Sequence, residues 1–257
     1  RITRYWDSFA GYLTFNHILY ENSPRYQYNF KAWRCQNNYK PGDPEPQVRE
    51  EAFPQLWQQH PEALLQLLLE SNCRPVHHFA TKALRADQEF CDRLDINTII
   101  QLLNKPYEVT VEFAFSLALT RYNPIEPNQA LVLAAANCIL HDARTQAYHW
   151  IEAQREYFFT SSVFIACLVT SKQTDTRAFA RRLLSSSILD DATARVLIGR
   201  IIAAVLALEP TQTEMAGEIG ETLLISFTPQ LRNLGFGAIL DLLRHPIPEI
   251  QTLGARI

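Results

Sequence analysis

A small residue recurs at nearly constant spacing along most of this chain, and this periodicity restricts its fold more than any other feature. The recurring positions are Ala80, Ala114, Ala147, Ala180, Ala216 and Gly254, so the steps are 34, 33, 33, 36 and 38 residues. Periods of this length are typical of arrays in which one supersecondary unit repeats and stacks on its neighbours. The segments HHFATKAL (77–84), VEFAFSLAL (111–119) and TRAFARRLL (176–184) carry the alignment.

Each small residue is expected in the second helix of a two-helix unit. An apolar pair, as in LLNKP (102–106) and LLRHP (242–246), ends the first helix about twelve positions earlier, and the proline then opens the second helix. The second helices carry one apolar stripe, formed by Phe79, Ala80, Ala83 and Leu84, by Phe113, Ala114, Leu117 and Ala118, and by Phe179, Ala180, Leu183 and Leu184. A helix pair cannot bury such a stripe alone, so the pattern predicts an all-α solenoid.

Composition agrees with a helical, folded chain. Of the 257 residues, 47% are apolar and 20% are charged, and only 8 are glycines, which favours helices over glycine-rich hairpins. The apolar runs at 63–71 and 194–208 are shorter than the roughly 18 residues of a membrane span, so no membrane partner is expected. A net charge of −3 argues against a basic field over the whole domain.

Cysteine usage and the chain ends bear on location and completeness. The five cysteines are odd in number and dispersed, and no C-x-x-C occurs, which indicates reduced thiols in the cytoplasm. No signal-peptide pattern is present. Because TLGARI (252–257) ends the sequence inside an apolar-periodic stretch, we expect a fragment truncated at its C-terminus.

Residues 1–46 differ from the rest, because 11 of the 28 aromatic residues lie within the first 40 positions. Residues 4–20 are expected to form one aromatic, amphipathic helix, and 21–46 an irregular segment. The favoured interpretation is a cap that covers the first repeat. The alternative is a recognition segment in which charge and stacking surface interleave, through Arg25, Tyr26, Tyr28, Lys31, Trp33 and Arg34.

The segment GDPEPQVREEAFPQL (42–56) looks like the second helix of a HEAT repeat. Together with the period, it makes residues 47–257 resemble the HEAT/armadillo-like helical repeat proteins. The resemblance implies an α-solenoid of HEAT-like two-helix repeats behind an aromatic-rich N-terminal helical cap. Pro54 departs from the pattern and should stop or kink that helix.

More weakly, the cap and first repeats are similar to bacterial proteins that join a WGR domain to HEAT-like repeats. This resemblance implies a nucleic-acid-linked or regulatory scaffold role without catalysis. The W-G-R tripeptide itself does not occur, and the nearest string is AWR (32–34).

The sequence offers little for metal or covalent chemistry. Cys73, His77, His78 and Cys91 could be combined as zinc ligands, but no second close ligand pair follows. In the repeat register His77 and His78 fall on the polar face, so surface or inter-repeat roles are expected. No nucleophile elbow, P-loop or dinucleotide fingerprint occurs, and Glu50-Glu51 and Asp190-Asp191 suit solvated faces or helix starts. We therefore expect no catalytic residues, no metal and no cofactor, and we expect that the protein is not an enzyme.

The polar face of the second helices is the candidate binding surface. Its cationic residues could form a basic ridge made of Lys82, Arg85, Arg144, His149, Arg177, Arg181 and Arg182. Glu112, Glu152, Glu218 and Glu221 interrupt it, so a mixed solvated face with local ion pairs is the simpler interpretation. As a binding surface the ridge would contact an acidic peptide or a phosphate backbone.

Three functions follow from these patterns. The favoured one is a non-enzymatic protein-interaction scaffold or regulatory adaptor. The first alternative is a nucleic-acid-binding helical-repeat protein that uses the basic ridge. The second is a HEAT-like bilin lyase or chaperone, which needs an aromatic groove with a reactive carboxylate or thiol, and no residue can be assigned to that role.

Overall fold

The computed structural model describes residues 12–187 and 189–257, and in this part the chain is predominantly helical. Seventeen helices and one two-stranded sheet are described. The chain forms two compact units that meet between Thr120 and Arg121. Among the described helices, none combines the length and apolar character needed to cross a membrane. The prediction of a helical fold is confirmed, and the small sheet is an addition that the sequence did not indicate.

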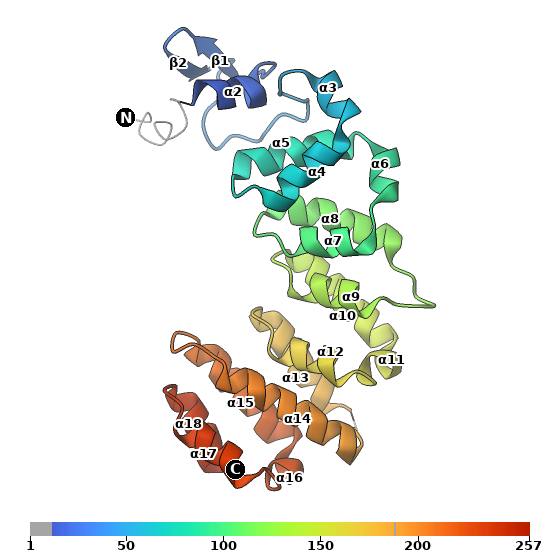
Figure 1. The fold of residues 1–257 in the computed structure, drawn as a ribbon, viewed down its shortest axis with the longest axis vertical. Coiled ribbons are helices and arrows are strands. Elements are labelled where there is room, and N and C mark those ends of the chain that lie inside the picture. Colours follow the sequence, from blue (N-terminus) through green and yellow to red (C-terminus); the bar gives the residue numbers. More distant parts are fainter. Residues whose placement is uncertain (1–11, 188) are drawn as a thin grey trace. The chain divides into compact units, whose positions relative to one another are not determined.

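The first unit contains a short N-terminal helix, a hairpin and then helices in close succession (Figure 1). Helix α2 packs on α5, α4 pairs with α5, and α4 also contacts α7. The elements are α2 (Leu13–Tyr20), β1 (Tyr26–Asn29), β2 (Ala32–Cys35), α3 (Pro54–Gln59), α4 (Pro61–Glu70), α5 (Arg74–Arg85), α6 (Gln88–Arg93), α7 (Ile96–Leu103) and α8 (Glu108–Arg121).

The β-hairpin corrects the expectation of an irregular segment over 21–46. Its antiparallel strands pair Tyr28 with Trp33 and Tyr26 with Cys35. Aromatic residues suit a pleated, half-buried surface, and Tyr28 and Trp33 pack beside His17 of α2, with ring centroids 4.8 and 5.1 Å from His17. Of the helix expected over 4–20, residues 13–20 form α2 with Tyr12 as its N-cap, and residues 4–11 lie outside the described part.

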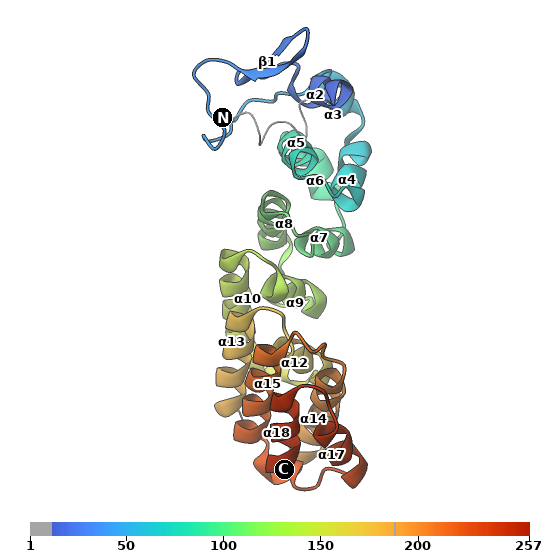
Figure 2. The same cartoon turned by 90° about the vertical axis from the view of Figure 1, so that its left-hand side faces the viewer.

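The second unit consists of helix pairs that follow one another in two layers (Figures 1 and 2). In one layer α12 contacts both α9 and α14, and in the other α15 contacts both α13 and α18. The elements are α9 (Gln129–Asn137), α10 (His141–Ala153), α11 (Arg155–Phe159), α12 (Ser162–Val169), α13 (Thr174–Ser185), α14 (Asp191–Leu206), α15 (Thr213–Ser226), α16 (Thr228–Leu231), α17 (Phe236–Leu243) and α18 (Pro248–Arg256).

The predicted stripes form the cores of both units. All six recurring small residues are buried, and so is every member of the three predicted stripes. Helices α7 and α17 end at Leu103 and Leu243, and α8 and α18 begin just after the prolines that follow. The apolar pair, the proline and the small residue therefore mark the helix ends and the close contacts that the sequence predicts.

One hydrogen bond recurs in four helix pairs and explains several errors of the sequence analysis. The residue three positions before the small residue donates to the carbonyl six residues earlier, in the turn that leaves the first helix. The distances are 2.9 Å for His77 Nε2 to Ser71 O, 3.0 Å for Arg144 Nη1 to Cys138 O, 2.8 Å for Arg177 Nη1 to Ser171 O and 2.8 Å for Gln251 Nε2 to His245 O. The turn carbonyl would otherwise be an unsatisfied helix-end acceptor.

His77 is consequently buried, which corrects its expected place on the polar face. The carbonyl of Ser71 can only accept, so Nε2 carries the proton and Nδ1 accepts from the Thr110 hydroxyl at 2.8 Å. Burial lowers the pKa of His77, which favours this neutral form. Thr110 belongs to α8, so His77 joins two successive helix pairs.

The stretch that most resembled a HEAT helix is not helical. Residues 47–53 are irregular, and α3 begins only at Pro54, with Phe53 as its N-cap. Glu50 and Glu51 are buried, which corrects their expected solvated position, because Arg25 and Arg49 pair with them. Asp190, in contrast, caps α14 as expected, since its side chain accepts from Thr193 N.

The close approach of α18 to α17 at Gly254 predicts that two glycine-to-alanine substitutions change stability in opposite directions. A Cβ added at Gly254 would lie 2.9 Å from Leu242 Cβ and 3.2 Å from Leu243 N, whereas one added at Gly199 meets nothing within 4 Å. Gly254→Ala should therefore lower the free energy of unfolding by about 1–3 kcal/mol. Gly199→Ala should raise it by up to about 1 kcal/mol. Urea denaturation measures both, and equal effects would contradict the close contact.

Candidate functional site

The predicted ridge residues are divided between the two units. Lys82 and Arg85 lie on α5 of the first unit. The second unit carries the other five, with Arg144 and His149 on α10 and Arg177, Arg181 and Arg182 on α13. Each unit thus carries its own part of the predicted ridge.

Arg144 and Arg177 do not form part of an exposed surface, which corrects their expected place on the polar face. They are only 9% and 6% exposed, since each guanidinium turns toward the preceding inter-helix turn. Another nitrogen of each guanidinium binds a carboxylate of a neighbouring helix. Arg144 Nε lies 2.8 Å from Asp175 Oδ2, and Arg177 Nε lies 2.5 Å from Glu218 Oε2. Both arginines therefore tie successive helices together.

The exposed arginines also face carboxylates. Arg181 Nη1 lies 3.0 Å from Glu221 Oε2, Arg182 Nη2 lies 3.8 Å from Glu152 Oε1, and Arg85 Nη2 lies 3.9 Å from Glu112 Oε2. Arg182 keeps 70% of its side chain exposed and also lies over the Phe179 ring. His149 is exposed, and no hydrogen bond or ion pair of its side chain occurs in the described part of the chain. The second-helix surface of each unit is therefore a mixture of both charges.

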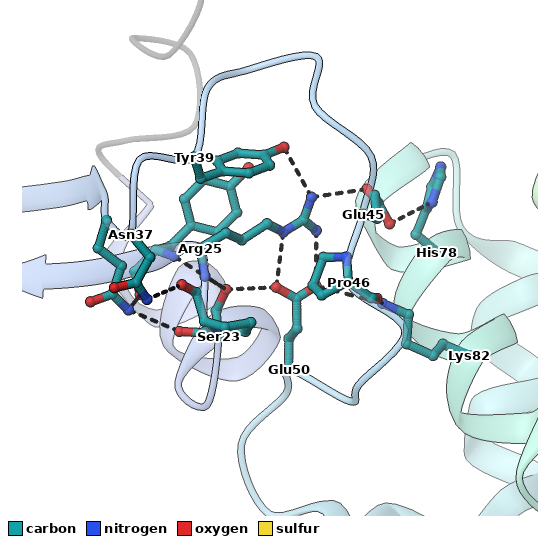
Figure 3. A network of polar contacts seen from close by, with 12 residues as sticks. Ser23, Arg25, Asn37, Tyr39, Glu45, Pro46, Glu50, His78 and Lys82 are labelled. Carbon is teal, nitrogen blue, oxygen red and sulfur yellow. Dashed lines mark hydrogen bonds and ion pairs between the residues drawn. The ribbon is translucent and has the colours of Figure 1, made fainter.

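The most elaborate polar cluster surrounds Arg25, directly before the hairpin (Figure 3). Arg25 binds the Glu50 carboxylate with two nitrogens, at 2.8 Å from Nε and 2.9 Å from Nη2. The Ser23 hydroxyl donates to the same carboxylate at 2.6 Å. Three tyrosine rings enclose the guanidinium, with centroids 5.7, 5.0 and 5.4 Å away for Tyr20, Tyr26 and Tyr39. A bidentate pair inside an aromatic cage fixes residues 43–51 against α2 and the hairpin.

Residues 43–51, an acidic segment that includes Glu45 and Glu50, also lie on α5. Glu45 accepts from His78 at 3.0 Å and contacts Arg25 Nη1 at 3.3 Å. Lys82 Nζ donates to the Pro46 carbonyl at 2.7 Å and lies 3.6 Å from Glu50 Oε2. Lys82, the first residue of the predicted ridge, is thereby engaged within the chain.

We call the contacts of Arg25, Glu45 and Glu50 with their partners the Arg25 network. These contacts join parts of the chain to one another, which indicates a structural role. The adjoining cavity of about 20 Å³ has room for roughly one water molecule. Burial raises the pKa of Tyr20 to about 12, so its hydroxyl stays protonated beside the guanidinium. The network can hold the N-terminal segment in place, but this cavity has no room for a substrate.

An open groove of about 610 Å³ lies between α2 and the start of α3, on residues that the sequence analysis did not select. Ile18 and Phe53 supply its apolar surface, and the ion pair of His17 with Glu21, 2.7 Å long, borders it. Thr14, Asn22 and Gln55 add uncharged polar groups. The lining is thus mixed, with apolar side chains flanked by polar ones.

Phe53 is the unusual residue of this groove. Its φ of 54° lies in the left-handed region, which costs about 1–2 kcal/mol for a residue other than glycine. Its side chain is nevertheless 69% exposed, so little burial offsets the strain. The only sequence signal was the Phe-Pro dipeptide, which suggested a stop or kink in the expected helix and no site.

None of the aromatic residues proposed for the recognition segment is exposed, although Phe30 in the hairpin turn is 93% exposed. Tyr26 and Trp33 are buried and Tyr28 is half-buried, whereas Lys31 and Arg34 are exposed. Arg25 is enclosed in the network described above.

The combination of Cys73, His77, His78 and Cys91 is not assembled as a metal site. Within the described residues, no group of three or more histidine, cysteine, aspartate or glutamate side chains could hold an ion. His77 instead stacks on Tyr107 at 3.7 Å, and the Cys91 thiol donates to the Leu84 carbonyl at 3.3 Å. All five cysteines are free thiols.

Removal of Arg25 tests the network. Arg25→Met leaves the Glu50 carboxylate buried with its main cation gone, so the free energy of unfolding should fall by about 3–5 kcal/mol. Arg181→Met is the matched control, because it removes an exposed ion pair worth about 1 kcal/mol or less. Urea denaturation distinguishes the two. Arg25→Met combined with Glu50→Gln should recover much of the loss, and equal effects of the two single variants would contradict a structural network.

The contacts of Glu45 predict that the stability of the folded state depends on pH. The hydrogen bond with His78, opposed by burial and aided by the charge of Arg25, lowers the pKa of Glu45 from 4.5 to about 2. The folded state therefore favours the ionised form, and this stabilisation is present above about pH 4.5 and is lost as the pH falls toward 2. Glu45→Gln should reduce stability at neutral pH and flatten the acid limb of the stability profile. An unchanged limb would contradict the pairing.

No family model, no curated protein and no solved structure matches this sequence or its fold.

Proposed function

We propose that the chain is a protein-interaction scaffold built from HEAT-like two-helix repeats, with residues 12–46 as part of its cap. The recurring turn hydrogen bond supports the repeat, since His77, Arg144, Arg177 and Gln251 make it at the same register position. The successive contacts of α9, α12 and α14 support stacking in the second unit.

The pairing of the ridge arginines with carboxylates is our reason for proposing a protein partner and not a nucleic acid. Arg144 and Arg177 are buried, and Arg85, Arg181 and Arg182 each face a carboxylate. Nucleic-acid binding needs cations that neutralise phosphates, and cations paired with carboxylates supply little of that charge. Mixed surfaces of this kind favour a protein partner over a phosphate backbone.

The groove beside Phe53 is the proposed docking position. Its lining suits a protein segment that inserts an apolar side chain between Ile18 and Phe53 and places uncharged polar groups against Asn22 and Gln55. The strain at Phe53 supports this assignment, because it holds an apolar side chain in solvent at a cost in stability.

Phe53→Asn separates stability from binding. Asparagine tolerates the left-handed region and is a favoured N-cap, so the variant should be more stable than the wild type by about 1 kcal/mol. The same variant should lose, by at least about tenfold in affinity, the protein that the wild type captures from nuclease-treated extract. Thermal or urea denaturation and quantitative pull-down with the intact chain measure the two effects.

Ile125→Asn is the control, because Ile125 is strongly exposed in the second unit and should affect neither property. Capture that disappears entirely on nuclease treatment, together with oligonucleotide binding that weakens steeply with salt, would favour the nucleic-acid alternative. If Phe53→Asn captures the protein as well as the wild type does, the docking position does not lie in the groove.

A further inference from the structure

The β1–β2 hairpin carries cations that the rest of the fold leaves unpaired. Residues 22–42 include four lysines and arginines and no aspartate or glutamate. Arg25 is neutralised inside the Arg25 network, whereas Lys31 and Arg34 are exposed. Neither of these two forms an ion pair or a side-chain hydrogen bond within the described residues. The hairpin therefore differs from the helix surfaces, where the exposed ridge arginines face carboxylates.

An aromatic ring lies beside these cations. Phe30 occupies the turn between the two strands, directly before Lys31, and is 93% exposed. The ring of Tyr28 lies 6.3 Å away, centroid to centroid, and covers little of the Phe30 surface. The Phe30 ring is thus available for stacking with another flat group.

The strands add free amides to the same surface. The side chains of Tyr28 and Trp33 face α2. Since side chains alternate along a strand, Gln27, Asn29 and Arg34 lie on the opposite face, and all three are exposed. The two side-chain amides form no hydrogen bond within the part of the chain that the structure describes, so their donors and acceptors are open to a ligand.

A single-stranded nucleic acid matches this set of groups. Its bases have flat apolar faces that suit Phe30 and polar edges that suit the amides, and its phosphates supply the negative charge that Lys31 and Arg34 lack as a partner. A duplex offers no such base, because its bases are stacked on one another. We infer that the hairpin binds single-stranded nucleic acid, with one base stacked on Phe30 and the adjacent phosphates against Lys31 and Arg34.

Two other anionic partners fit the hairpin less well. Membrane insertion needs more apolar surface than the single large apolar side chain of the turn, Phe30. An acidic protein segment pairs with the two cations but has no flat group for the ring. The contact goes beyond the proposed scaffold function, and it uses none of the residues that line the groove beside Phe53.

The size of the contact determines its salt dependence. Each phosphate that a single strand gives up to a cation releases about 0.7 counterion, so two such contacts predict a slope of about −1.4 for the logarithm of the association constant against the logarithm of the salt concentration. A strand that lay along the predicted ridge would contact more phosphates and give a steeper slope. Binding at the hairpin is therefore weak and is measured at low salt.

Fluorescence anisotropy with a labelled oligonucleotide tests the inference. The 257-residue chain is titrated into an oligonucleotide of about ten thymidines, between about 20 and about 200 mM salt. Phe30→Ser should weaken binding by about 5- to 100-fold, which is the effect of one lost stacking contact. Lys31→Gln combined with Arg34→Gln should remove most of the salt dependence. The circular dichroism and unfolding midpoint of these variants should match the wild type, since all three side chains are exposed.

An oligomer of abasic residues with the same number of phosphates separates stacking from charge. It should bind the wild type as weakly as the thymidine oligomer binds Phe30→Ser, and it should not distinguish the two proteins. Ile125→Ser and Lys172→Gln are the matched controls, because they remove an exposed apolar side chain and an exposed cation from the second unit and should leave binding unchanged.

Three results overturn the inference. The first is a wild-type chain that does not bind the thymidine oligomer even at about 20 mM salt. The second is equal affinity of the wild type for the thymidine and abasic oligomers, or unchanged thymidine binding in Phe30→Ser. The third is equal or tighter binding to phosphatidylserine vesicles or to polyglutamate, which assigns the hairpin to a membrane surface or to an acidic protein.

Discussion

The hydrogen bond from the second helix to the turn before it is the interaction on which the helix pairs depend. A tight turn between two helices leaves the last carbonyls of the first helix without partners, and an unpaired carbonyl that is wholly or partly buried costs stability. His77, Arg144, Arg177 and Gln251 satisfy one such carbonyl each. With the turn held in this way, the small residue three positions later can approach the first helix closely.

This use of polar side chains also determines the charge of the surface. Two of the arginines that could have formed a basic ridge are used inside the fold, where their second contacts are Asp175 and Glu218 on neighbouring helices. The exposed arginines face further carboxylates across the helix pairs. The charges therefore link successive helices and leave a balanced surface, which suits a protein partner better than a polyanion.

The first unit adds a different arrangement at its N-terminal end. Arg25 gathers three tyrosines, Glu45 and Glu50 into one network and so holds an irregular acidic segment on α5. Because that segment is fixed, the chain reaches α3 through the left-handed Phe53 and leaves a groove beside α2.

The sequence by itself determined the helical class, the positions of the small residues and the apolar stripes, because local spacing and proline placement are properties of a single helix pair. It also located the candidate polar residues without indicating their roles. Only the tertiary structure decided that His77, Arg144 and Arg177 turn inward, that Glu50 is buried with Arg25, and that residues 26–35 pair as a hairpin. Each of these outcomes depends on a partner distant in the chain, such as a turn carbonyl, a cation or a second strand, and periodicity carries no information about such partners.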